Sequence, residues 1–169
     1  MFQSAAHPGP AGDRLWGETL RAFGRPVAVL ARPRPGWRRT VGRGSADGHL
    51  QRLDLAYGAE HTVGVQVTTQ RRLPEHVRVF STLEPDALLS EFLFQHSSPD
   101  GPVCPPWVLT SGPGHLVVDG TGVEAQRLAY GDHLVSLAVV GEETVAVVSA
   151  AALHDEAVHL TFDTTALQA

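Results

Sequence analysis

Short strand-like segments, separated by turns that contain glycine, fill the last third of the chain and restrict its fold more than any other feature. The turns include Asp119-Gly120 and Gly141-Glu142-Glu143, whose residue types are typical of antiparallel hairpins. Two of the segments, 133–140 and 144–149, are apolar on both faces and are predicted to lie centrally in a sheet. The candidate strands of this region are 115–118, 123–128, 133–140, 144–149 and 158–162.

The first half of the chain carries further strand signals. Residues 62–68 alternate, with Val63, Val65 and Val67 on one side, which predicts a strand with one covered face and one solvated face. Residues 37–43 are polar and basic, and they predict either an edge strand or a loop. The candidate strands of this half are 27–31, 37–43, 50–57, 62–68 and 77–80.

Two helical patterns accompany these strands. The first begins near Asp13, which is a suitable N-terminal cap, and ends before Gly24. The second follows Thr82 and extends to about residue 96, where a proline-rich loop, 97–114, begins. Together the elements predict an α+β fold. It is a mainly antiparallel β-sheet of meander and hairpins, with one N-terminal and one mid-chain helix packed on it.

The domain organisation follows from the same elements. Residues 1–12 are rich in proline, glycine and alanine and are predicted to form a disordered tail. Residues 13–169 are predicted to form a single α+β domain. An alternative arrangement has two lobes, 13–80 and 81–169, each with a helix and hairpins.

A partial internal match favours the alternative with two lobes. Residues 47–67 and 119–140 both contain Asp-Gly, Gln-Arg-Leu and Ala-Tyr-Gly in that order, so the halves could be pseudo-repeats that arose by duplication. Shared hairpin residue types in a restricted amino-acid alphabet explain the match better than duplication does, because the gaps within the match differ.

Composition excludes several kinds of chemistry. Lysine, isoleucine and asparagine are absent, a bias expected of a GC-rich bacterial genome. Without lysine the chain cannot form a pyridoxal Schiff base or use a phosphate-binding Walker lysine. Cys104 is the single cysteine, which excludes an internal disulfide and clusters held by several cysteines. Because neither a secretory pattern nor a long apolar run is present, we predict a cytoplasmic protein that does not enter a membrane.

Motifs for catalysis and metal binding are missing. The histidines lack metal-site spacing, and His154 and His159 are predicted on opposite faces of a strand. No serine lies in a Gly-x-Ser-x-Gly turn. We therefore predict no catalytic, cofactor-binding or metal-binding residue and no cofactor. An alternative is a small hydrolase or isomerase that uses His61 or His133 in a sheet-lined pocket.

Charge is divided unequally along the chain. Residues 1–78 carry 12 arginines against six acidic residues, whereas 79–169 carry one arginine against 12 acidic residues. A basic half and an acidic half can attract each other within one fold, or each can meet a partner of opposite charge.

An arginine-rich segment within the basic half supplies the candidate contact residues. Arginine side chains beside an exposed indole suit contacts with phosphate, carboxylate or nucleic acid. The alternative is a basic edge strand that resists aggregation and docks onto the acidic half of the chain. The candidate residues are Arg32, Arg34, Trp37, Arg38, Arg39 and Arg43.

Because catalytic motifs are missing, the leading hypothesis is a non-catalytic binding or accessory protein. It would engage another protein, or a second copy of itself, through sheet edges and charged faces. An arginine-dependent binder of polyanions or nucleic acid is a further alternative. The net charge of −5 and the sequence pI of about 5.9 disfavour nucleic acid as the partner.

Overall fold

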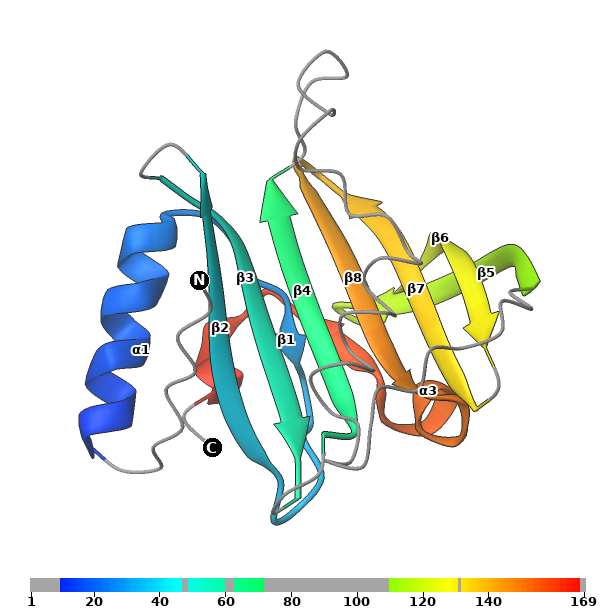
Figure 1. Ribbon diagram of the computed structural model, residues 1–169, viewed down its shortest axis with the longest axis horizontal. Helices are drawn as coiled ribbons and strands as arrows, with labels where there is room; N and C mark the ends of the chain where they lie inside the picture. Colours follow the sequence, from blue (N-terminus) through cyan, green and yellow to red (C-terminus); the bar gives the residue numbers. More distant parts are fainter. Residues whose placement is uncertain (1–9, 47–48, 60–62, 72–109, 131, 168–169) are drawn as a thin grey trace, which may run out of the picture.

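The computed structural model describes residues 10–46, 49–59, 63–71, 110–130 and 132–167. They form one curled sheet of nine strands with helical segments beside it (Figure 1). The helical segments are α1 (Pro10–Phe23), α3 (Ala151–Ala157) and the 3-10 turn η2 (Thr164–Leu167). The strands are β1 (Val29–Leu30), β2 (Arg38–Ala46), β3 (His49–Gly58), β4 (Val65–Arg71), β5 (Thr110–Val118), β6 (Thr121–Tyr130), β7 (His133–Val140), β8 (Glu143–Ala150) and β9 (His159–Thr161).

The strands follow the order β1-β9-β5-β6-β7-β8-β4-β3-β2. Neighbouring strands are antiparallel except β5 and β9, which are parallel, so the sheet is mixed. The predicted α+β class and the mainly antiparallel sheet are confirmed. β7 and β8 lie inside the sheet, as their apolar sequences predicted, and the pairing of β8 with β4 joins the two halves of the chain.

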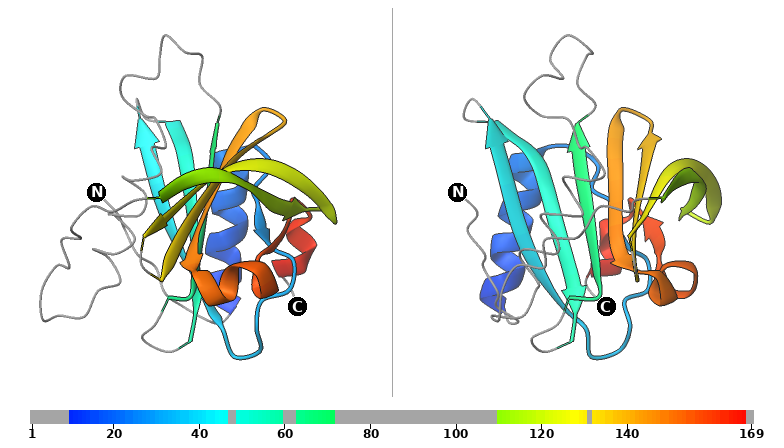
Figure 2. Two further views of the ribbon diagram at one scale, coloured as in Figure 1. Left: turned by 90° about the vertical axis from the view of Figure 1, so that its right-hand side faces the viewer. Right: turned by 45° about the vertical axis from the view of Figure 1, so that its right-hand side comes forward.

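The hydrophobic core lies on the face of the sheet that packs against α1, which we call the α1 face. Phe23 of α1 and Leu30 of β1 are buried there together with Leu55, Val67 and Val147 of the sheet. Cross-strand register places Leu55, Val67 and Val147 side by side on this face. Figure 2 shows the sheet curling beside α1, so one helix and one short strand fill much of its concave side.

α1 ends where the sequence predicts and begins earlier. Gly24 has a φ of 62°, and its N–H donates a hydrogen bond of 3.0 Å to the carbonyl of Leu20, which is a glycine C-cap. The helix begins at Pro10, so residues 10–12, predicted as part of a disordered tail, are helical. Proline suits the first helical position because the N–H that it lacks would have no partner there.

The β1 end of the sheet is closed by side chains. The Leu30 N–H donates to the hydroxyl of Tyr57 at 3.3 Å, and the Ala28 N–H donates to Oγ1 of Thr69 at 3.0 Å. The Ala31 N–H donates to the carbonyl of His159 at 2.8 Å. Hydroxyls from β3 and β4 thus reach across the concave side and satisfy backbone groups beside the terminal strand.

One expectation for β4 is wrong. The alternation of residues 62–68 predicts a solvated polar face, but Gln66 and Thr68 are only 2% and 1% exposed. Both polar side chains have partners, because Thr68 Oγ1 donates to Oδ1 of Asp54 and Gln66 Nε2 donates to Thr68 Oγ1 at 3.5 Å. Buried polar groups that bond to one another produce the same sequence alternation as a wet face.

The region before residue 115 also differs from its prediction as a loop and turn. Residues 110–114 belong to β5, and Pro113 lies within that strand opposite Gln126 of β6. β9 pairs with β5 only at Val117 and Val118, so at Pro113 the described sheet has a neighbour on one side only. Proline is tolerated where no second neighbour needs its missing N–H.

Several predictions fall outside the described residues, and two elements were not predicted. The expected strand 77–80, the mid-chain helix after residue 82 and the loop from residue 97 to 109 lie outside the described residues. α3 and η2 had no clear sequence pattern and were missed. Among the described residues, no helix has the length and apolar character needed to cross a bilayer.

The two segments with shared motifs both contribute antiparallel hairpins, β3–β4 and β6–β7. Their orientations differ. Leu53 lies on the α1 face, whereas Leu128, at the same place in the motif, is paired with Val135 on the opposite face. A duplicated unit would keep equivalent side chains on one face, so the hairpins do not show repeated halves.

Candidate functional site

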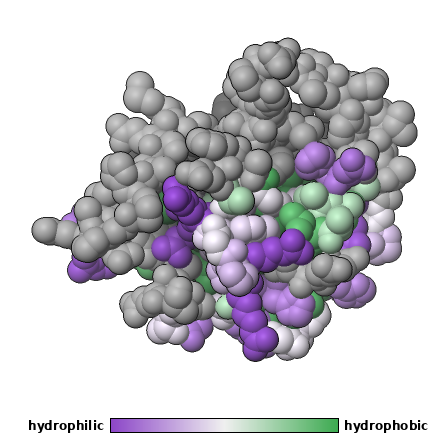
Figure 3. Space-filling view, turned by 90° about the horizontal axis from the view of Figure 1, so that it is seen from below, coloured by the Kyte–Doolittle hydropathy of each residue, from purple (hydrophilic) through white to green (hydrophobic). Residues whose placement is uncertain are grey.

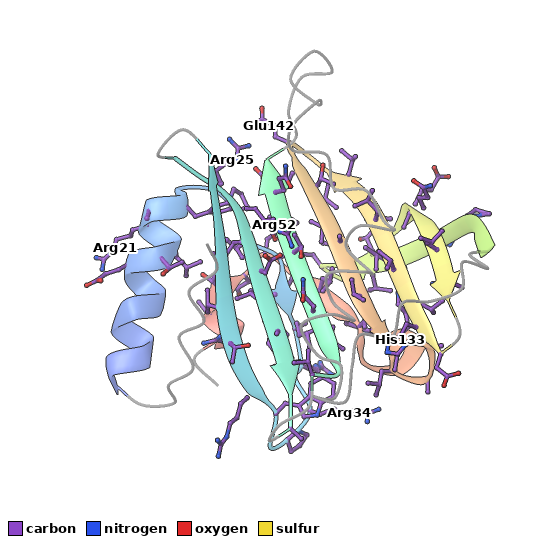
Figure 4. All side chains as sticks on the ribbon, in the orientation of Figure 1. Arg21, Arg25, Arg34, Arg52, His133 and Glu142 are labelled. Atoms are coloured by element: carbon purple, nitrogen blue, oxygen red, sulfur yellow. The ribbon has the colours of Figure 1, made fainter. Side chains whose placement is uncertain are left out.

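The arginines between residues 21 and 39 lie at different places on the molecule. Figure 4 shows Arg25 at one end of the sheet, close to the β7–β8 turn, and Arg34 at the other end. Arg21 projects from the outer side of α1 and is exposed. Closeness in the sequence therefore does not produce a single basic patch.

Arg25 connects the basic half of the chain to the acidic half. Its Nε donates to Oε1 of Glu143 at 2.7 Å, and its Nη2 donates to Oε2 of Glu142 at 3.2 Å. The Glu143 side chain is 4% exposed, whereas that of Glu142 is 88% exposed. The hydrogen bond to Glu143 raises the pKa of Arg25 further, so this guanidinium is charged at all ordinary pH values. The attraction between halves that the charge division predicts is present at this pair.

A second group of arginines lies where the β1–β2 connection enters β2. Arg32, Arg34 and Arg38 are exposed, and the guanidinium carbon of Arg34 lies 5.7 Å from the centroid of the Trp37 ring. This distance suits a cation–π contact, which holds the arginine against the indole. Figure 3 views the molecule from this end and shows strongly hydrophilic side chains beside smaller apolar groups.

Trp37 differs from its expected role. The sequence predicts an exposed indole, but Trp37 is half-buried and packs against the core. A Cβ added to Gly64 would lie 3.0 Å from Trp37 Cζ2 and 3.3 Å from Leu153 Cδ1. The indole therefore occupies the space that the missing side chain of Gly64 leaves, and it anchors the start of β2.

Arg38 and Arg39 point to opposite faces because they are consecutive in a strand. Arg39 is half-buried and is the register partner of Tyr57 on the α1 face. Burial raises the pKa of Tyr57 to about 12, although hydrogen bonds from Leu30 and Arg39 act in the opposite direction. Arg43 is the register partner of Leu53 in β2, and its side chain lies outside the described set.

β2, the strand that carries these arginines, is a terminal strand of the sheet. It is last in the strand order and pairs with β3, and no described strand lies on its other side. Of the two predictions for residues 37–43, an edge strand or a loop, the structure shows a strand, and it lies at an edge among the described strands. Its register with β3 shifts between Gly44 and Ser45, which marks a bulge near the end of the strand. Arginines and a bulge are two devices that keep an edge strand from pairing indiscriminately.

A buried histidine cluster, which the sequence did not predict, lies on the α1 face beside α3. Nε2 of His154 is 2.8 Å from Oγ of Ser136, and Nδ1 of His154 is 3.4 Å from Nη2 of Arg127. Ser136 is 0% exposed and His154 is 4% exposed. The sequence carried no signal for this cluster, because its members come from β6, β7 and a helix that the pattern did not reveal.

The direction of the hydrogen bond between His154 and Ser136 does not suit nucleophilic catalysis. A guanidinium can only donate hydrogen bonds, so Nδ1 of His154 accepts one from Arg127. We therefore assign the proton of the neutral imidazole to Nε2, so that Nε2–H donates to Oγ of Ser136. A catalytic base must instead accept the proton of its serine. The cluster is therefore better explained as a polar contact that ties α3 to the sheet.

The other candidates for chemistry are dispersed. His133 is half-buried at the start of β7, and His159 is exposed in β9. His61 and Cys104 lie outside the described residues. Within the described part of the chain, no three histidine, cysteine or acidic side chains are grouped closely enough to hold a metal ion.

Comparisons with protein-family models, with curated proteins and with solved structures give no match to this chain.

Proposed function

We propose that this chain is a non-catalytic binding protein that holds a partner protein by adding an extended segment of the partner to the β2 edge. The observation that carries the proposal is the terminal position of β2, nine residues long, beside β3 alone among the described strands. A sheet edge of this kind offers main-chain N–H and C=O groups in the spacing of a strand.

The contrast between the two ends of the sheet supports this assignment. β1 has only two residues, and its surroundings are closed by the hydroxyls of Tyr57 and Thr69. β2 is long, and Trp37 fixes its first residues against the core. A rigid edge loses little conformational entropy when a partner strand pairs with it.

The test compares two proline substitutions in β2. The N–H groups of consecutive strand residues point to opposite sides, so one of Thr40→Pro and Val41→Pro disturbs the pairing with β3 and the other alters only the outer edge. The variant that keeps the wild-type melting temperature identifies the residue whose N–H points away from β3. Short random peptides displayed on phage are then selected on the wild-type chain, on this variant and on Thr40→Ala, which keeps its N–H.

We expect extended peptides to be enriched on the wild type and on Thr40→Ala, but not on the folded proline variant. If both proline variants unfold, methylation of alternate backbone amides in an enriched peptide gives the same test on the wild-type chain. The proposal would be contradicted if peptides were enriched on the folded proline variant, or if methylated peptides still bound the wild-type chain. It would also be contradicted if no peptide were enriched on any of the chains.

A second candidate function is an arginine-dependent binder of polyanions. The exposure of Arg32, Arg34 and Arg38 at one end of the molecule favours it. Such binding would weaken steeply with salt and would be independent of the β2 backbone. The hydrolase or isomerase alternative has less support. Ser136 and His154 are buried, and the direction of their hydrogen bond does not suit a catalytic base. His133 is half-buried at the start of β7, and His61 lies outside the described residues.

A further inference from the structure

We infer that two copies of this chain form a dimer by exchanging their N-terminal arms, which we define as residues 10–30. The partner is a second copy of the chain, and the surface that receives its arm is the α1 face. Exchange of this kind needs an arm that packs on the sheet through contacts independent of its covalent connection, and a hinge that can extend. The inference does not depend on the binding function proposed for β2.

The arm covers the α1 face with apolar side chains. Phe23, Val27 and Leu30 are at most 5% exposed and belong to the hydrophobic core. If the arm left, the core residues of the sheet beneath it would face water, so the sheet needs another arm of the same shape. A second copy supplies this shape because its arm has the identical sequence.

The polar contacts of the arm are made with residues far along the chain. The backbone N–H groups of Ala28 and Leu30 donate to the hydroxyls of Thr69 and Tyr57, and β1 pairs with β9. None of these contacts involves the segment that joins the arm to β2. An arm from a second copy can therefore form the same hydrogen bonds with the same geometry.

The hinge lies between two anchored positions. The Ala31 N–H donates to the carbonyl of His159, and Trp37 packs against the core, so residues 32–36 form the connection. Every residue of this connection is exposed. Figures 1 and 4 show that the chain leaves the Arg25 end of the sheet, passes through β1, turns in the hinge and returns as β2.

The sequence of the hinge favours an extended chain over this turn. Pro33 and Pro35 each restrict the residue before them to extended conformations. The turn instead needs Gly36 at a φ of 81°, and it is held by a hydrogen bond of 3.1 Å from the Trp37 N–H to the carbonyl of Arg34. Because closure within one chain does not depend on protein concentration, we expect dilute protein to be monomeric and concentrated protein to exchange its arms.

Alanine at Gly36 tests the hinge. An added Cβ would meet nothing within 4 Å, so Gly36→Ala penalises only the left-handed conformation of the closed turn. An extended hinge does not need that conformation, so both copies of the dimer escape the penalty. Gly120→Ala is the matched control, because Gly120 has a φ of 76° and equally open surroundings but lies in the β5–β6 turn.

Each full-length chain is unfolded in urea, refolded at a low and a high protein concentration, and measured by analytical ultracentrifugation. We expect the dimer fraction of the wild type to rise with concentration. Gly36→Ala should raise the dimerisation constant by roughly tenfold or more, because two hinges lose the left-handed residue. Gly120→Ala should leave this constant at the wild-type value, because its turn is the same in monomer and dimer.

A pair of charge reversals distinguishes arm exchange from other dimers. Arg25→Glu and Glu143→Arg each bring like charges together when the arm packs on its own sheet. In a mixed dimer with exchanged arms, the substituted arm meets the substituted sheet and the native arm meets the native sheet. We expect the equimolar mixture to form mixed dimers that melt at a higher temperature than either variant alone. Mixtures of each variant with the wild type are the control, because every exchanged dimer there keeps one contact between like charges.

Three results would overturn the inference. They are a wild type that stays monomeric at the high concentration, an equal rise in dimers for Gly36→Ala and Gly120→Ala, and a folded mixture of the charge variants that gains no stability. If the charge variants do not fold even together, the outward proline in β2 is combined with Gly36→Ala. Dimers that persist in this variant support arm exchange, whereas their loss assigns the dimer to the β2 edge and overturns the inference.

Discussion

At the scale of single residues, burial rather than residue type decides what a polar group does. Tyr57 and His154 are both buried beside an arginine, and each is held by hydrogen bonds that the sequence does not reveal. Arg34 is exposed and stacks on Trp37, whereas Arg25 pairs with Glu143. Residues of one type in one segment therefore have different energetic roles.

Tyr57 should make stability fall at alkaline pH. Its pKa is raised from 10.0 to about 12 in the folded protein, so above pH 10 the unfolded chain loses a proton that the folded protein retains. Stability is therefore complete below pH 10 and falls by about 2–3 kcal/mol as the pH rises to about 12.

Urea unfolding at a series of alkaline pH values measures this loss. The chain has no lysine, so few other side chains titrate in this range. Tyr57→Phe should be less stable by about 1 kcal/mol at neutral pH, because the Leu30 N–H loses its acceptor, and should show a flatter alkaline profile. Tyr130→Phe is the control, and an equal flattening in that variant would refute the assignment.

Ser136→Ala tests the hydrogen bond that we assign to His154. The substitution leaves Nε2–H of His154 buried without its acceptor, which should lower the free energy of unfolding by about 1–3 kcal/mol. His159→Ala alters an exposed histidine and should change stability by less than about 0.5 kcal/mol. Thermal unfolding of both variants is the measurement, and a fully stable Ser136→Ala would show that the bond contributes nothing.

At the scale of elements, position in the sheet explains where the strand predictions succeed and fail. β8 was predicted well because it is buried along most of both faces and is therefore apolar, and β7, its neighbour, is buried at its centre although Val139 is 48% exposed. The polar face of β4 was wrongly predicted to be solvated, because its buried polar side chains form hydrogen bonds to Asp54 and to one another. β5 contains proline and glycine that indicate a turn, and its open side in the described sheet tolerates them. The success or failure of each strand prediction therefore depended on the neighbouring strands in the sheet, which the sequence pattern of one segment does not reveal.

Gly64 tests how the start of β2 is anchored. Alanine at this position would place Cβ 3.0 Å from the Trp37 ring, so the indole must shift. We expect Gly64→Ala to lose about 1–2 kcal/mol of stability and to change the tryptophan fluorescence. Gly122→Ala, where an added Cβ meets nothing within 4 Å, is the matched control and should be neutral. Equal behaviour of the two variants in chemical denaturation would exclude a packing role for Gly64.

At the scale of the whole molecule, the charge division along the chain has two consequences. One is an internal contact, in which Arg25 from the basic half pairs with Glu142 and Glu143 from the acidic half. The other is a group of exposed arginines, Arg32, Arg34 and Arg38, at the opposite end of the sheet. Of the two alternatives that the charge division predicted, the attraction within one fold is observed at Arg25, and contact with a partner of opposite charge stays a proposal.

Arg25→Gln should destabilise the chain because it leaves the carboxylate of Glu143 buried without its ion pair. We expect a loss of about 2–3 kcal/mol, measured by urea unfolding. Glu142→Gln removes only the exposed member of the group and should cost less than about 0.5 kcal/mol. A similar loss in both variants would mean that burial of Glu143 does not determine the strength of the contact.

The sequence by itself determined the local elements: α1 up to Gly24, the apolar central strands, the hairpin turns and the basic edge strand. These follow from propensity, periodicity and turn chemistry, which act over a few neighbouring residues. Only the tertiary structure decided that Arg25 pairs with Glu143, that Trp37 is an anchor and that Ser136 meets His154. Those outcomes depend on contacts between segments far apart in the chain. The free energy of such a contact depends on both segments, so neither segment alone predicts it.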